Sequence, residues 1–156
     1  MAKADTLAIW NRLAPLPGGK WLFSQLACLK APYFGSIWPR FVDLRPGRCE
    51  LSMRKRRAVL NHIGTVHAIA MCNLAELAAG TMTDVTIPAT HRWIPKGMTV
   101  RYLKKATTGL TAIATPAAAP DWSTPVDYPV TVLVQDRRAE RVFEAVITMR
   151  VSPKRT

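Results

Sequence analysis

The fold of this chain is decided by residues 65–80, which read TVHAIAMCNLAELAAG. Apolar side chains cover every face of the helix that this stretch predicts, whereas a surface helix carries them on one stripe. A soluble helix of this kind has to be surrounded by other structure. Thr65 can cap its first turn through the hydroxyl, and Gly80 can end it in a left-handed conformation. We therefore predict a buried central helix over about residues 65–80.

Strand-like segments lie on both sides of this helix. Residues 37–44 and 48–56 flank the turn Arg45-Pro46-Gly47, which predicts a hairpin. Segments rich in Val, Ile, Thr and Tyr follow the helix at residues 85–93, 98–105, 110–115, 130–136 and 142–151, and residues 115–129 form a proline-rich loop between two of them. This order predicts an α+β fold in which an antiparallel sheet wraps around the central helix.

Two further helices are expected before the sheet, at residues 5–14 and about 20–30. Pro15, Pro17 and the pair Gly18-Gly19 separate them. A chain of 156 residues has the size of one domain with a sizeable core. We divide it into an N-terminal helical extension, residues 1–35, and a main domain, residues 36–156.

The net charge of +12 favours anionic partners such as a nucleotide cofactor, nucleic acid or an acidic membrane surface, although solubility alone is an equal explanation. Nucleic-acid binding would need basic residues interleaved with exposed aromatic residues. Only Arg92-Trp93 and Arg101-Tyr102 form such close pairs. We therefore expect no nucleic-acid partner, and the motifs have to decide among the rest.

Three scattered cysteines, Cys28, Cys49 and Cys72, predict neither a disulfide framework nor a zinc site, and we expect all three in the core. Their number favours a reducing compartment. The first residues show no secretory signal, and the longest charge-free run contains polar side chains that a membrane span of about twenty apolar residues excludes. We expect a cytoplasmic protein without a membrane span.

Glu76 is the only formally charged side chain between Ala58 and Thr83. Burial of a lone carboxylate is costly unless it is paired or protonated, so its presence on the central helix calls for a reason. One interpretation is a general base. The other is that Glu76 emerges at an edge of the helix or pairs with an arginine of a neighbouring strand.

Asn61, Gly64 and His67 lie at the predicted start of the same helix. The first N–H groups of a helix have no internal partner and attract negative charge. The N–H of Ala68 and the side-chain amide of Asn61 could therefore hold the oxyanion that develops on a thioester carbonyl. The alternatives are that Asn61 bonds its own turn and that His67 is a structural histidine.

His67 and Glu76 are nine residues apart, or two and a half helical turns. Their side chains leave opposite sides of the helix and cannot easily reach one substrate within one subunit. If both act, they act from two chains across a symmetric interface.

The segment Asn61-His62-Ile63-Gly64-Thr65-Val66-His67, followed nine positions later by Glu76, resembles the active-site motif of hotdog-fold thioesterases of the PaaI-like group. That motif is Asn-x-x-Gly-x-x-His-Gly-Gly with an Asp or Glu nine residues after the histidine. Residues 97–106 also look like the strand that follows the central helix in that family. The resemblance covers roughly residues 36–151 and looks closest to an uncharacterised bacterial branch.

The resemblance implies a hotdog fold and an acyl-CoA hydrolase that works as a dimer or tetramer. Asn61 and the Ala68 N–H would polarise the thioester carbonyl, and Glu76 of the facing subunit would be the general base or nucleophile. The site would need no metal and no cofactor besides the coenzyme A of the substrate. The acyl chain is left open, although one or more of the five tryptophans could shape its pocket.

Two departures from the motif matter. The Gly-Gly pair is Ala68-Ile69 here, and a serine or threonine that orients water in some relatives has no clear counterpart. They favour, as an alternative, a non-catalytic protein that binds acyl-CoA or an acyl-carrier protein. Hydration or dehydration of an acyl thioester is a third interpretation, but its different His and Asp arrangement cannot be located here.

Coenzyme A would give the positive charge a specific role. Arg57 ends a basic run before the motif, and Lys104 and Lys105 end a later strand. These three cations could contact the phosphates of the cofactor arm, with Gly64 in the substrate-binding loop. A solvated basic face is the alternative for each of them.

Overall fold

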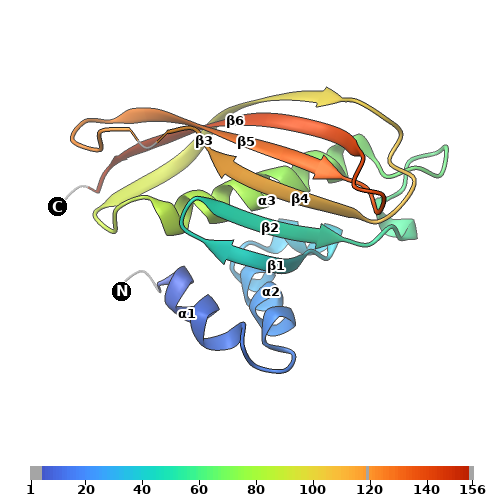
Figure 1. Cartoon of the computed structure of the whole chain (residues 1–156), viewed down its shortest axis with the longest axis horizontal. Coiled ribbons are helices and arrows are strands. Elements are labelled where there is room, and N and C mark those ends of the chain that lie inside the picture. Colours follow the sequence, from blue (N-terminus) through green and yellow to red (C-terminus); the bar gives the residue numbers. More distant parts are fainter. Residues whose placement is uncertain (1–4, 119, 155–156) are drawn as a thin grey trace.

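The computed structural model describes residues 5–118 and 120–154. Its elements, in chain order, are α1 (Thr6–Leu13), α2 (Gly19–Lys30), the 3-10 helix η1 (Pro32–Ile37), β1 (Arg40–Arg45), β2 (Arg48–Met53), the 3-10 turn η2 (Arg57–Val59), α3 (Ala68–Thr86), β3 (His91–Tyr102), β4 (Leu110–Pro116), β5 (Val126–Gln135) and β6 (Arg141–Pro153). Figure 1 shows the sheet curving over α3, with α1 and α2 near β1.

The six strands form one antiparallel sheet in the order β1-β2-β4-β5-β6-β3. Helix α3 packs against the concave face, where it contacts every strand. This is the α+β hotdog fold, as the sequence predicts. Strand β3 is an edge of the sheet, so only one side of its backbone is paired, with β6.

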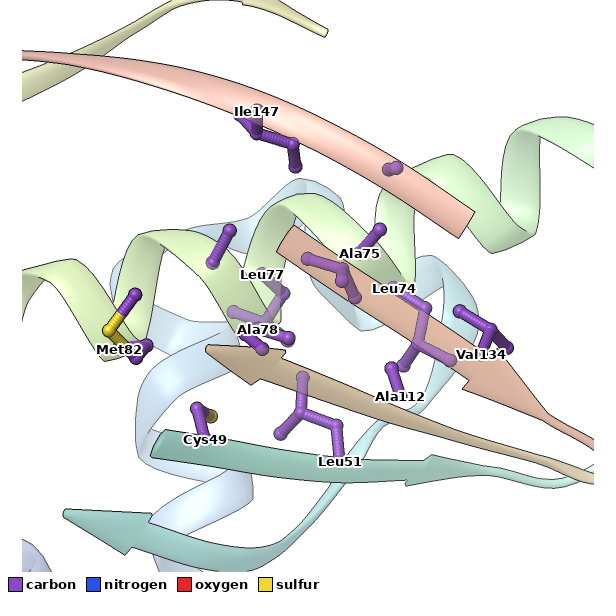
Figure 2. Packing of buried hydrophobic residues seen from close by; sticks show 14 of the residues in the cluster. Cys49, Leu51, Leu74, Ala75, Leu77, Ala78, Met82, Ala112, Val134 and Ile147 are labelled. Carbon is purple, nitrogen blue, oxygen red and sulfur yellow. The ribbon is translucent and has the colours of Figure 1, made fainter. Parts of the chain in front are cut away.

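Small side chains let α3 lie close to the sheet. Ala75, Ala78 and Ala79 are completely buried, as are the larger Leu74 and Met82. Figure 2 shows Leu74, Ala75, Ala78 and Met82 packed among buried strand residues, which include Cys49, Leu51, Ala112, Val134 and Ile147. The apolar character of the helix beyond its sheet-facing side is explained by η1 and α1, which contact α3, and by α2, which faces α3 across a cavity.

The predicted ends of the central helix were wrong at both termini. The helix begins at Ala68, and its N-cap is His67, whose Nδ1 accepts a hydrogen bond from the Ile69 N–H at 3.0 Å. Thr65 instead belongs to a loop that folds on itself. Gly80 lies inside the helix, which continues to Thr86.

The longer helix also corrects the strands. The separate strand predicted at residues 85–93 does not exist, because α3 takes its first residues and β3 is a single strand from His91 to Tyr102. The hairpin is confirmed, with Gly47 at a φ of +78° in its turn. Both N-terminal helices are confirmed as well.

The cysteines are less uniformly buried than expected. Cys49 is completely buried, whereas Cys28 and Cys72 are half-buried, and all three are free thiols. In the part of the chain that the structure describes, no helix has the length and apolarity needed to cross a membrane.

Candidate functional site

The loop before α3 is held by Asn61. Its Oδ1 accepts hydrogen bonds from the backbone N–H groups of Ile63 at 3.1 Å and Thr65 at 3.0 Å, and its Nδ2 donates to Thr65 Oγ1 at 2.8 Å. Gly64 supplies the positive φ of +75° that the tight loop requires. Asn61 therefore stabilises its own loop, which is the alternative to a role in binding the thioester carbonyl.

The last residue of the loop before α3 has an extended backbone conformation. His67 N–H donates to Val59 O at 2.8 Å, which holds His67 at φ −64° and ψ 139°, outside the helix. Because its Nδ1 accepts the Ile69 N–H, the proton of the neutral ring is placed on Nε2. The Ala68 N–H has no acceptor among the described residues, so it is available to a ligand.

Two of the three basic candidates flank this loop. Val66 N–H donates to Ala106 O at 2.8 Å, which brings the chain next to Lys105 beside the loop, and the bond to Val59 brings η2, with Arg57, to its other side. Lys104 is different, because its Nζ forms an exposed ion pair with Glu140 at 3.1 Å. Arg57 and Lys105 are thus two residues and one residue away from backbone that is bonded to this segment.

Glu76 lies elsewhere, on the half-buried side of α3 beneath the N-terminal helices. It lines a cavity of about 540 Å³ whose walls come from α1, α2, η1, α3 and the beginning of β3. It makes no hydrogen bond or ion pair with any residue that the structure describes. The cavity is mostly apolar, although Lys30 also lines it, and a carboxylate in such a place can accept a proton from water or substrate.

Asp84 is a second carboxylate on the same cavity, and it was not predicted from the sequence. It accepts hydrogen bonds from Thr6 Oγ1 at 2.7 Å and from Trp93 Nε1 at 3.1 Å. Eight residues separate it from Glu76, so the two lie on related faces of the helix. The sequence hides this residue, because a helix that ends at Gly80 leaves Asp84 outside it.

Cys72 lies one turn before Glu76 and forms a hydrogen bond with the Tyr102 hydroxyl at 3.4 Å. This bond, with a smaller effect of burial, raises the pKa of Tyr102 to about 12. The phenol is half exposed at the end of β3, so this edge of the sheet carries a neutral hydroxyl near the central part of α3.

The predicted site residues therefore form two groups. Asn61, Gly64, His67 and Ala68 meet at the helix start, whereas Glu76 lies farther along α3. Eight residues of helix from Ala68 to Glu76 correspond to about 12 Å. One subunit does not bring the base and the oxyanion donor together. In the described ranges, no group of three or more His, Cys, Asp or Glu side chains could hold a metal ion.

Three comparisons with known proteins extend this picture. A structural-genomics crystal structure is 49% identical in sequence, covers 97% of this chain and 100% of its own, and has a TM-score of 0.84. A protein of unknown function from Pseudomonas aeruginosa, described as a probable thioesterase, is 24% identical, with 89% and 97% of the two chains covered and a TM-score of 0.77. A thioesterase family protein from Silicibacter pomeroyi is 18% identical, with 84% and 96% covered and a TM-score of 0.72.

At their low identity, the last two likenesses establish the hotdog fold and not the reaction. No curated protein matches the chain. The family model described as "Domain of unknown function (DUF4442)" matches residues 19–151, a span that includes α2, the loop at Asn61 and all of α3. The chain belongs to the DUF4442 family, whose fold it shares with structures named as thioesterases.

Proposed function

We propose that this protein hydrolyses acyl-CoA or a related acyl thioester at a site shared by two subunits, and that it resembles PaaI-like thioesterases in this respect. The observation that carries the proposal is a pair of groups: the Ala68 N–H at a helix start and the Glu76 carboxylate on a mostly apolar cavity. Neither has a bonding partner among residues 5–118 and 120–154.

The helix start suits a developing oxyanion. The N-terminus of α3 adds its positive end to the Ala68 N–H, and Asn61 retains a second amide hydrogen beside the one donated to Thr65. Removal of one such donor from an oxyanion site typically slows an enzyme by about 100- to 1,000-fold.

Glu76 supplies the complementary chemistry. As a general base it would take a proton from water while the water oxygen attacks the thioester carbonyl carbon. The tetrahedral oxyanion would then collapse, the carbon–sulfur bond would break, and the thiolate would leave and take up the proton. The products are a carboxylic acid and free thiol, and no metal or organic cofactor takes part.

The separation along α3 requires a second subunit, and β3 offers the surface for it. This edge strand spans twelve residues, pairs with β6 as its one neighbour among the described strands, and exposes Ile94, Met98 and Tyr102. Long exposed edges tend to pair with another chain. Pairing of two β3 strands around a two-fold axis would give a homodimer with two equivalent sites, which could assemble further into a tetramer.

Coenzyme A fits the charge around the helix start. Arg57 and Lys105 flank the loop at Asn61, and Lys104 would have to exchange its Glu140 partner for a phosphate. A cytoplasmic location suits this function, because the three free thiols favour a reducing compartment.

The test is hydrolysis of an acyl-CoA panel, followed by release of free thiol. Glu76→Gln should slow hydrolysis by roughly 100- to 10,000-fold, the usual contribution of a general base. Glu50→Gln is the matched control, because Glu50 pairs with Arg48 on β2 and does not line the cavity. Equal rates for both variants would remove Glu76 from the mechanism.

The second candidate function is binding of acyl-CoA or an acyl-carrier protein without hydrolysis. It is favoured by the Asn61 side chain, whose oxygen and one amide hydrogen are already engaged within the loop. Saturable binding of acyl-CoA with no release of thiol would select this function over the first.

A further inference from the structure

The proposed hydrolysis uses only the Glu76 carboxylate of the cavity and leaves the rest of its volume without a function. Its volume of about 540 Å³ falls within the roughly 300–1,000 Å³ typical of small-molecule sites. Apolar side chains dominate its walls, and they include Ile9, Phe23, Leu26, Phe34, Leu77 and Trp93. An interior of this kind takes up hydrocarbon.

The cavity has two different ends. At one end, Asp84 joins α1 to β3 through its hydrogen bonds with Thr6 and Trp93. At the other end, Glu76 has no described partner. The two carboxylates are eight residues apart on α3, or about 12 Å, so the space between them is elongated along the helix.

The walls also leave room for a chain. Ala27 and Ala31 on the α2 side and Gly80 on α3 present little or no side chain to the cavity. Trp93 fills the position opposite Gly80, where its ring occupies the space of an absent Cβ. Helix α2, the second of the two helices before the sheet, forms this wall.

We propose that this cavity holds the acyl chain of the substrate, and that the chain is an unbranched aliphatic one of medium length, with its carbonyl end at Glu76 and its methyl end toward Trp93. The inference rests on the proposed thioester chemistry and adds the substrate class. In this arrangement, α2 limits the length of the acyl chain that the cavity can hold.

The probes are hexanol, octanol and decanol, because they carry the aliphatic chain without a charge and are not hydrolysed. Calorimetric titration of the full-length protein should show affinity rising by up to about fourfold for each methylene that enters the cavity. Affinity independent of chain length would overturn the proposal.

Two variants of α2 make a matched pair. Leu26 lines the cavity and is 43% exposed, whereas Leu22 does not line it and is 42% exposed. Leu26→Asp should weaken decanol binding by at least about tenfold, since a carboxylate on the wall opposes burial of a chain. Leu22→Asp should stay within about twofold of the unmodified protein, as surface substitutions usually do. Equal affinities for the two variants would overturn the proposal.

Ala27→Phe provides a second, independent test by filling the cavity. Decanol should lose affinity while hexanol keeps it within about twofold, because only the longer chain needs the lost space. Equal effects on both alcohols would contradict the proposal. Thermal unfolding and sedimentation of each variant check that fold and assembly are intact.

The outcome is separable from that of the hydrolysis experiment. In Glu76→Gln, which no longer hydrolyses thioesters, the gain in alcohol affinity for each added methylene should match that of the unmodified protein, because the methylenes contact the apolar walls and not residue 76. Suppose that hydrolysis depends on Glu76 while Leu26→Asp and Ala27→Phe bind every alcohol normally. That result would support the proposed hydrolase function and place the acyl-chain site elsewhere. If the alcohols bind as predicted but Glu76→Gln still hydrolyses thioesters, the cavity is the acyl-chain site and the proposed role of Glu76 as general base is wrong.

Discussion

Gly80 lies against the ring of Trp93, so that a Cβ built at residue 80 would come within 2.7 Å of the ring atom Cη2. The ring cannot turn away freely, because its Nε1 donates to Asp84 at 3.1 Å. A glycine in the middle of a helix is thus explained by the close approach of an aromatic ring from β3.

Gly80→Ala should therefore destabilise the protein by about 1 kcal/mol, because overpacking outweighs the gain in helix propensity. Chemical denaturation measures the change in the free energy of unfolding. In a Trp93→Leu background the clash is absent, and the same substitution should stabilise by up to about 1 kcal/mol. Stabilisation in both backgrounds would show that the contact does not constrain residue 80.

The contact between Gly80 and Trp93 also explains why the sequence alone could not predict where the central helix ends. Apolar residues on all sides of residues 65–80 predicted a wrapped helix, and the fold follows from that pattern together with the hairpin signal at Pro46-Gly47. Gly80 was ambiguous, because a glycine can end a helix or make room for a neighbour, and the neighbour is a residue of another element. Asp84 was missed for the same reason.

The helix start was misplaced because of a competition among local bonds. Thr65 is a good capping residue, but its N–H and hydroxyl are both engaged by Asn61, and His67 is held extended by Val59. Asn61, Gly64, His67 and Ala68 lie in the loop before α3 or at the start of the helix, and the roles that the motif gives them stay predictions. The cavity could not be predicted, since it depends on how α1 and α2 settle against α3.

The two possible roles of Asn61 lead to different results for Asn61→Asp. This substitution keeps the oxygen that accepts from the Ile63 and Thr65 N–H groups, and it removes the amide donor. If the amide polarises the thioester, hydrolysis should fall by about 100-fold or more with little change in thermal stability. Asn61→Ala should in addition lower the free energy of unfolding by about 1–3 kcal/mol, because it leaves loop N–H groups unpaired. Full activity of Asn61→Asp would restrict Asn61 to the turn.

Cys72→Ala should lower the pKa of Tyr102 from about 12 toward the ordinary value of about 10, because the hydrogen bond with Cys72 is the main cause of the increase. A raised pKa in the folded state means that this contribution to stability is present below the unfolded value and is lost as pH rises toward about 12. Spectrophotometric titration of phenolate measures the pKa, and Tyr102→Phe identifies its signal. An unchanged titration in Cys72→Ala would assign the shift to another cause.

The proposed active site is shared by two subunits, and complementation between inactive variants tests this sharing directly. Glu76→Gln removes the base. Ala68→Pro removes the N–H donor at the first helical position, where proline is tolerated. Each homodimer should be inactive. Co-expressed at equal levels, the two variants should recover about a quarter of the normal activity, because half of the dimers are mixed and each mixed dimer has one intact site of two. A mixture as inactive as its components would contradict a shared site and place both groups in one subunit.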